Sequence, residues 1–282
     1  MENNEQLAAG AGAAYDIDVA RGFFESGGQP DAFPAGTVIF SENEKAGLFS
    51  LKRNRMYLLL EGEVHLGANG KVFGSVAPGE IFGEMASFSQ AARSASATAR
   101  RACKVLSLDD RQFQDALRKK PEFALMMMSV MIGRLRRSLA HLKNETTGAG
   151  NATSAGSRVF ERKLLNELVQ ELGENLRMNC PRGMVIMQEG QVGDLMYIVL
   201  EGRILIFIRG TAVEKIGSGA VFGEMALVEK GQRLATAVTD TDCSLLAINR
   251  SAFLELIRTK PQFGMTLLSA IGERARKTTA RI

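Results

Sequence analysis

Residues 82–86 read Phe82-Gly83-Glu84-Met85-Ala86, and Arg93-Ser94-Ala95 follow a short distance on. The same pentapeptide returns as Phe222-Gly223-Glu224-Met225-Ala226, followed by Arg233-Leu234-Ala235. In both copies the arginine lies nine positions after the glutamate. A pentapeptide that occurs twice is compatible with chance. The same pentapeptide with the same displaced arginine indicates a duplicated element, and each copy is called a cassette below.

The duplication extends over most of the chain. From Tyr57 onward, equivalent residues lie 140 positions apart, as in Tyr57 with Tyr197, Gly62 with Gly202, Cys103 with Cys243, and Pro121 with Pro261. Before that point the offset is 147, which equates Pro34-Ala35-Gly36 with Pro181-Arg182-Gly183. The first copy therefore has seven extra residues, within about residues 41–55. A period this long indicates two whole domains rather than a solenoid.

Length and composition agree with two domains of a globular protein. The 282 residues can build two ordinary cores, and hydrophobic and charged contents of 45% and 23% are typical of globular chains. No apolar run approaches the roughly 20 residues of a membrane span, and residues 1–14 lack the pattern of a signal peptide. Three cysteines fit a reducing compartment, and Cys103 and Cys243 are predicted to be core residues. We expect a cytoplasmic protein without membrane contact, with a disordered lead over 1–14.

Several functional classes are not expected. A net charge of +4 is too small to require nucleic acid, and two histidines exclude a histidine-rich metal site, so no metal is expected. The cassettes contain no nucleophile–base pair, so the chain is not expected to be an enzyme. Too few residues follow Ile271 to build a helix-turn-helix, so direct DNA binding is not expected.

Each copy combines a β region with helices. Residues 15–33 are predicted to carry a short amphipathic helix, and residues 33–108 consist of short apolar runs separated by turns, which predicts a sandwich or barrel. Asp109 or Asp110 is expected to cap a following helix, and Pro121 to begin a longer one. In the second copy, a helix over 158–176 is expected before a β region that starts at Pro181.

The helix over residues 122–143 has an apolar seam with alternating spacings of three and four, formed by Leu125, Met128, Ile132, Leu135, Leu139 and Leu142. The seam packs either on its own domain or against a second copy of the chain, and we slightly favour a homodimer through this helix. Residues 144–157 are small and polar, which is typical of a flexible linker. The predicted domains are therefore 15–143 and 158–282.

The cassette residues fit a particular ligand chemistry. Glycine lets a ligand approach the main chain closely, and a helix that begins after it directs N–H groups towards an anion. Arginine offers a planar fork to phosphate oxygens. An ionised glutamate only accepts hydrogen bonds, which suits a hydroxyl group such as those of ribose. Together these groups indicate a sugar phosphate or a nucleotide.

These residues closely resemble the phosphate-binding cassette of the cyclic-nucleotide-binding domain, the family that includes catabolite activator protein, protein kinase A regulatory subunits and cyclic-nucleotide-gated channels. The resemblance implies a mainly β fold with flanking helices, in which two such domains of the double-stranded β-helix or jelly-roll type follow in tandem. It implies that Glu84 and Glu224 bind the ribose 2′-hydroxyl, and that Arg93 and Arg233 bind the cyclic phosphate. The implied ligand is cyclic AMP or cyclic GMP.

The two copies depart from the family pattern in two places. The second copy keeps Glu189-Gly190-x-x-Gly193-Asp194 before its Tyr197 strand, whereas the first copy has Asn43-Glu44-Lys45-Ala46-Gly47 and extra residues, so we expect an altered loop there. Ser94 has a hydroxyl that Leu234 lacks. This difference leaves the purine choice of the first site open and favours cyclic AMP in the second.

The sequence thus predicts a cytoplasmic sensor of cyclic nucleotide, with cyclic AMP favoured, that signals by conformational change to an unidentified effector protein. Two alternatives stay open. One is a scaffold without ligand, in which each Glu and Arg form a salt bridge inside a loop and the fold serves dimerisation. The other is the same pocket with a cyclic dinucleotide as its ligand.

Overall fold

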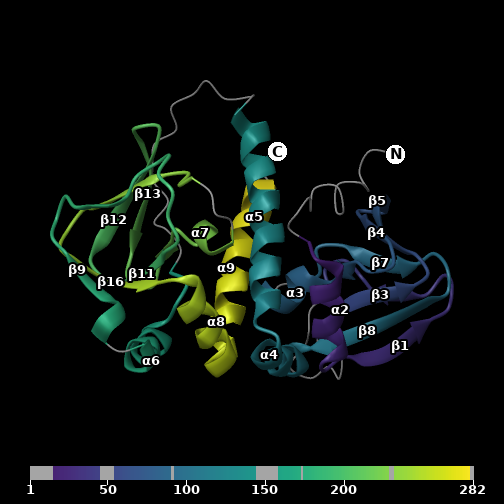
Figure 1. The fold of residues 1–282 in the computed structure, drawn as a ribbon. Coiled ribbons are helices and arrows are strands. Elements are labelled where there is room, and N and C mark those ends of the chain that lie inside the picture. The colour runs from purple at the N-terminus through teal and green to yellow at the C-terminus, as the bar shows by residue number, and fades with distance from the viewer. Residues whose placement is uncertain are drawn as a thin grey trace. The chain divides into compact units, whose positions relative to one another are not determined.

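The computed structural model describes residues 15–44, 54–89, 92–143, 158–172, 174–228 and 232–279. The chain divides into two compact units, Met1–His141 together with Ile257–Ile282, and Leu142–Leu256. Among the described residues, each unit contains two four-stranded sheets whose strands pair antiparallel (Figure 1).

The first repeat forms both of its sheets from strands that are distant in sequence. Their orders are β1-β8-β3-β6 and β2-β7-β4-β5. The strands are β1 (Gln29–Phe33), β2 (Val38–Phe40), β3 (Arg55–Glu61), β4 (Val64–Ala68), β5 (Lys71–Val76), β6 (Ile81–Phe82), β7 (Ser96–Ala99) and β8 (Cys103–Asp109). Two such interleaved antiparallel sheets are the arrangement of a jelly roll.

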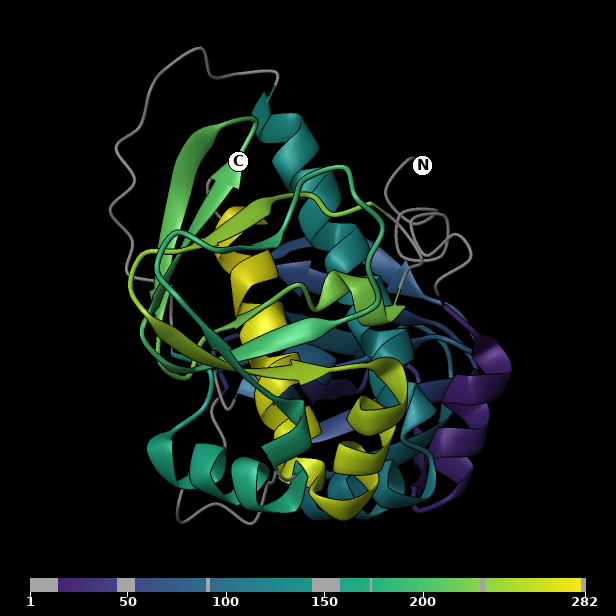
Figure 2. The same cartoon turned by 60° about the vertical axis from the view of Figure 1, so that its left-hand side comes forward.

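The second repeat has the same topology, with the orders β14-β11-β16-β9 and β10-β15-β12-β13. Its strands are β9 (Arg177–Cys180), β10 (Val185–Met187), β11 (Met196–Glu201), β12 (Arg203–Ile208), β13 (Thr211–Gly217), β14 (Val221–Phe222), β15 (Thr236–Thr239) and β16 (Cys243–Ile248). Figure 2 shows these green strands in a view turned by 60°.

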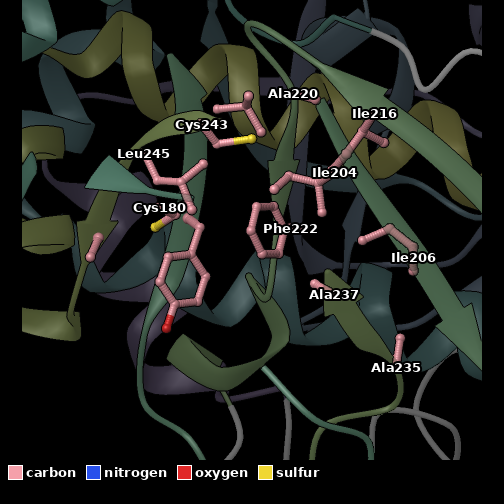
Figure 3. Packing of buried hydrophobic residues seen from close by; sticks show 13 residues of the cluster. Cys180, Ile204, Ile206, Ile216, Ala220, Phe222, Ala235, Ala237, Cys243 and Leu245 are labelled. Carbon is pink, nitrogen blue, oxygen red and sulfur yellow. The ribbon is translucent and has the colours of Figure 1, made fainter. Parts of the chain in front are cut away.

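Each sandwich closes over an apolar core. In the second repeat the ring of Phe222 lies among small and branched side chains from several strands, including Ile204, Ile216 and Ala237 (Figure 3). In the first repeat Phe82 belongs to the equivalent cluster. Cys103 and Cys243 are buried in these two clusters, as the sequence predicts for core residues.

Helices flank the sandwiches. They are α2 (Ile17–Glu25), α3 (Glu84–Ser89), α4 (Asp110–Lys119), α5 (Glu122–Lys143), α6 (Arg162–Leu172), the 3-10 helix η2 (Glu174–Leu176), α7 (Met225–Val228), α8 (Arg250–Thr259) and α9 (Pro261–Thr279). Asp109, rather than Asp110, caps α4: its side chain accepts from the Gln112 N–H, while the Gln112 side chain accepts from the Asp109 N–H.

Aromatic rings join the helices of the first repeat. Phe23 of α2 stacks on Phe123 of α5, with centroids 3.7 Å apart, and meets Phe113 of α4 edge-on at 5.1 Å. All three rings are fully or almost fully buried. Such contacts add to the free energy of apolar burial, so they fix α2, α4 and α5 as one helical group.

Some predicted boundaries are wrong. Within residues 15–33 the helix ends at Glu25, and β1 occupies 29–33. The helix expected over 158–176 begins only at Arg162, because the Val159 and Phe160 N–H groups donate to the Gly219 carbonyl, at 2.9 Å each. The second β region already begins at β9, before Pro181. The short strand β7 has only serine, alanine and threonine and gave no apolar signal.

The long helix α5 spans residues 122–143, and of its seam Leu125, Met128 and Ile132 are buried. The other seam side chains, the linker over 144–157 and the lead over 1–14 lie outside the described residues.

The last helix, α9, belongs to the first compact unit, where it contacts α3 and α4. The domain limits of 15–143 and 158–282 follow the sequence repeat and stay a prediction.

Candidate functional site

The two cassettes begin with a stacked pair of aromatic rings. Phe82 of β6 pairs with Tyr57 of β3, and Phe222 of β14 pairs with Tyr197 of β11. The ring centroids are 5.0 Å apart in both pairs, with the planes inclined by 18° and 20°. The core therefore holds the start of each cassette in one orientation.

A glycine follows each phenylalanine in a conformation that favours glycine. Gly83 has φ 77° and Gly223 has φ 73°. A Cβ on Gly83 would lie 2.9 Å from Nη1 of Arg93, and a Cβ on Gly223 the same distance from Nη1 of Arg233. The main-chain angle therefore favours glycine, as the motif predicts, and the structure adds that the neighbouring guanidinium leaves little room for a Cβ.

The two arginines lie against the main chain of their own cassettes. Arg93 donates from Nη1 to the Gly83 carbonyl at 2.8 Å and from Nη2 to the Arg55 carbonyl at 2.9 Å. Arg233 donates to the Gly223 carbonyl at 3.1 Å and to the Leu195 carbonyl at 2.7 Å. These bonds are equivalent in the two repeats. They leave three of the five guanidinium N–H donors for a ligand.

Both guanidinium groups are buried, with Arg93 5% and Arg233 8% exposed. Neither takes part in an ion pair with another of the residues that the structure describes. Burial lowers the pKa of Arg93, and the nearby carboxylates of Glu44 and Glu84 oppose this shift. An arginine stays charged in a protein. Each cassette thus holds a buried cation whose side-chain hydrogen bonds go to neutral main-chain carbonyls, which suits an anionic ligand.

The main chain of each arginine is also anchored. In the first repeat, the Arg93 N–H donates to the Glu44 carbonyl, and the Asn43 N–H donates to the Arg93 carbonyl, both at 2.9 Å. In the second repeat, Arg233 makes the same two bonds with Gln191 and Gly190, at 2.8 and 2.9 Å. Asn43 has φ 62°, an angle that asparagine tolerates better than most residues. The described part of the altered loop, up to residue 44, therefore keeps this anchor; residues 45–53 lie outside it.

The glutamates of both cassettes are buried, and the charge of Glu84 acts on Arg93. Glu84 is the first residue of α3 and is 8% exposed, while Glu224 precedes α7 and is 9% exposed. Both glutamates interact with other groups of the chain. Because α3 and α7 are only six and four residues long, we assign no helix-terminus effect to them.

The remaining predicted site residues differ in exposure. Ala86, Ala95 and Ala235 are buried, whereas Ser94 and Leu234 are exposed, Leu234 by 45%. Met225 is half-buried. The side chains of Met85 and Ala226 lie outside the described set. Ser94 and Leu234 follow the arginines directly in the sequence, so the position that differs between the copies is exposed to solvent.

Sequence reasoning missed four contributors to the site. The carbonyls of Arg55 and Leu195 hold the arginines, and the ring of Phe40 lies 4.1 Å from the Arg93 Cζ. Gly193 gives Arg233 its space, because a Cβ there would lie 2.6 Å from the guanidinium Nε. Arg55 and Leu195 are equivalent at the offset of 140. Their role could not be predicted from the sequence, because every residue has a main-chain carbonyl whatever its side chain.

The turn before the first cassette is fixed from two sides. The Gly79 N–H donates to the Leu59 carbonyl at 2.7 Å, and the Tyr15 hydroxyl donates to the Gly79 carbonyl at 2.7 Å. Burial, followed by the charges of Glu80 and Glu84, raises the pKa of the Tyr15 phenol, so it stays a hydrogen-bond donor. The turn leads through β6 directly to Gly83.

Among the residues that the structure describes, no cluster of three or more His, Cys, Asp or Glu side chains has the arrangement of metal ligands. No described helix combines the length and the apolar character needed to cross a membrane.

The family model of the cyclic nucleotide-binding domain matches residues 30–120 and 177–260. These two regions make up more than half of the chain, so the chain belongs to this family and contains its domain twice. The predicted resemblance and the predicted fold of two tandem jelly-roll domains with flanking helices are confirmed. The family is a regulatory domain that binds cyclic nucleotides.

Curated relatives share parts of the chain. It is 32% identical over 127 residues to a cyclic AMP receptor protein of Thermus thermophilus, which covers 43% of this chain and 59% of that protein. It is 37% identical over 110 residues to a cyclic nucleotide-gated potassium channel of Rhizobium etli, covering 39% and 30%. It is 24% identical over 220 residues to a cGMP-dependent protein kinase of Eimeria tenella, covering 77% and 19%. The chain thus spans less than two thirds of each of these relatives.

Solved structures are also similar. A structure described as cAMP bound PfPKA-R (141-441) aligns with all of this chain and 93% of its own, at 19% identity and a TM-score of 0.34. The crystal structure of the catabolite activator protein of Thermus thermophilus aligns with 44% of this chain and 61% of its own, at 28% identity and a TM-score of 0.39.

Proposed function

We propose that this chain is a cytoplasmic sensor that binds a cyclic nucleotide, with cyclic AMP favoured, in both cassettes and signals to a partner protein by a conformational change. The observation that carries the proposal is the pair of buried arginines, Arg93 and Arg233, each held by two main-chain carbonyls and in no ion pair with the described residues. In this proposal a cyclic phosphate supplies an anionic hydrogen-bond acceptor for each guanidinium.

The other cassette residues complete the proposed ligand contacts. Glu84 and Glu224 are buried, and in this proposal they accept from the ribose 2′-hydroxyl. Exposed Ser94 offers a hydroxyl to the phosphate or the base in the first site, whereas Leu234 offers none in the second. The second site is therefore proposed to prefer cyclic AMP, and the two sites to differ in affinity.

A ligand shifts a conformational equilibrium only if it binds one state more tightly than the other. The cassette of the first repeat is connected to two elements that can report such a shift. The turn at Gly79 is bonded to Tyr15, and α3, which begins at Glu84, contacts α9. We propose that nucleotide binding moves these contacts and that an effector protein recognises the result.

The function is tested by titrating cyclic AMP and cyclic GMP into the purified protein by calorimetry, with Arg93→Ala and Arg233→Ala in parallel. Each variant loses charge-assisted hydrogen bonds worth about 1.5–3 kcal/mol apiece. One such bond corresponds to about tenfold or more in affinity. We expect two binding sites in the parent and the loss of one in each variant.

Arg100→Ala is the matched control for removing an arginine. Its guanidinium is exposed and pairs with Glu63 at 2.9 Å, away from both cassettes. We expect this variant to bind like the parent. If the parent binds neither nucleotide, the proposed function is wrong, and the scaffold or the cyclic-dinucleotide alternative takes its place. The homodimer through helix 122–143 stays a separate prediction, to be measured by sedimentation.

A further inference from the structure

An aromatic ring distinguishes the two arginine sites. The Arg93 Cζ lies 4.1 Å from the centroid of the Phe40 ring. At the equivalent position the second repeat has Met187, and the Arg233 Cζ lies over the ring of Tyr197, 6.0 Å from its centroid. A cation over a ring face at about 4 Å is strongly attracted, and the attraction weakens towards about 6 Å.

The backbone around this position is the same in both repeats. Phe40 is the last residue of β2 and is paired with Ala97 across a register shift, and Met187 is the last residue of β10 and is paired with Ala237 across an equivalent shift. The carbonyl acceptors of the two arginines are also equivalent. The ring is thus a local difference on a shared framework.

The core fixes the orientation of the Phe40 ring. Phe40 is 7% exposed and stacks against Tyr57 at 6.0 Å and against Phe82 at 6.1 Å. Its Cε1 would lie 3.2 Å from a Cβ on Gly83. The ring, the glycine and the guanidinium therefore interlock, and Arg93 has little freedom to leave its position.

We propose that Phe40 is a positioning residue that holds Arg93 ready for the phosphate of a cyclic nucleotide and makes the first site the tighter one. This inference rests on the proposed function. Arg93 keeps three N–H donors for the anion while its other two bind carbonyls, so it need not leave the ring to bind. A side chain that is already ordered loses less conformational entropy when the ligand binds. Met187 gives Arg233 no such ring.

The test exchanges the two residues, each in a protein with one working site. Phe40→Met is made with Arg233→Ala, so that only the first site reports, and Met187→Phe is made with Arg93→Ala. Cyclic AMP is titrated by calorimetry. We expect roughly three- to tenfold weaker binding for Phe40→Met and roughly three- to tenfold tighter binding for Met187→Phe. Phe40→Tyr keeps a ring and is expected to restore the affinity.

The tighter binding expected of Met187→Phe at the second site distinguishes a positioning role of Phe40 from a purely structural one. If Phe40 only filled the core, Phe40→Met would weaken binding but Met187→Phe would not strengthen it. In the parent without nucleotide, the ring current of Phe40 is also expected to shift the Arg93 Nε–H resonance, and Phe40→Met to remove that shift.

Unchanged or weaker binding by the Met187→Phe protein, with the parent binding normally, overturns this inference and leaves the proposed function intact. If Phe40→Met fails to fold, as judged by circular dichroism, the Met187→Phe and Phe40→Tyr proteins still decide. A parent protein that binds neither cyclic AMP nor cyclic GMP overturns both proposals.

Discussion

Gly83 has a positive φ and lies close to the Arg93 guanidinium, and substitutions can separate the effects of these two features. Alanine there adopts φ 77° with strain of about 1–2 kcal/mol, and its Cβ would also lie 2.9 Å from Nη1 of Arg93. We expect Gly83→Ala to lower the free energy of unfolding by more than this strain and to weaken nucleotide binding at the first site. Urea unfolding and calorimetry measure the two effects.

Gly70 provides the matched control. It has φ 75°, but a Cβ on it would meet no atom within 4 Å. Gly70→Ala is therefore expected to lower stability by the strain alone, about 1–2 kcal/mol, and to leave binding unchanged. Equal binding by the Gly83→Ala and Gly70→Ala proteins would contradict the role given to the close approach of Arg93.

Among the elements, the turn before β6 connects the first cassette to the segment that precedes α2. The Tyr15 hydroxyl donates to the Gly79 carbonyl, and the Ile17 side chain lies so close that a Cβ on Gly79 would be 2.2 Å from its Cδ1. In the second repeat the main chain of Val159 and Phe160 bonds to the equivalent carbonyl of Gly219. Both repeats thus attach their leading segment to the same turn.

We expect Tyr15→Phe to lower the free energy of unfolding by about 1 kcal/mol, because it removes one partly buried hydrogen bond and keeps the ring. The measurement is the urea midpoint, followed by circular dichroism. The control is Arg158→Ala, which removes an exposed bond of 3.2 Å from Nε to the Ser218 carbonyl. It is expected to change stability less, and the opposite order would contradict the assigned bond.

For the whole molecule, the compact units do not follow the sequence repeat. The last helix, α9, is part of the second repeat, since its Pro261 is equivalent to Pro121, but it belongs to the first unit, where it contacts α3. Because α3 begins at Glu84 of the first cassette, we expect nucleotide bound at Arg93 to slow hydrogen exchange of the α9 amides. Mass spectrometry of the Arg233→Ala protein with and without cyclic AMP measures this effect.

The Arg93→Ala protein serves as the control, since only its second site can bind. A smaller change in α9 is expected there. If α9 responded only to binding at Arg233, its contact with α3 would have no role in the response of the first site.

The sequence alone determined the duplication, the β class and the two cassettes. Equivalent residues keep one offset from Tyr57 to the end of the repeat, and short apolar runs between turns encode strands locally. It also predicted that Gly83 and Arg93 act together, because their residue types fit one chemistry. The predicted start of the helix at residue 158 was wrong. The helix α6 begins at Arg162, because the N–H groups of Val159 and Phe160 donate to the carbonyl of a residue some 60 positions later.

Only the tertiary structure decided how the arginines are held. The carbonyls of Arg55 and Leu195 and the ring of Phe40 reach the site from segments distant in sequence, and every residue has a carbonyl acceptor whatever its side chain. The placement of α9 with the first unit is likewise absent from the repeat pattern. Local patterns fix elements and motifs, whereas the packing of distant strands and helices determines which groups meet.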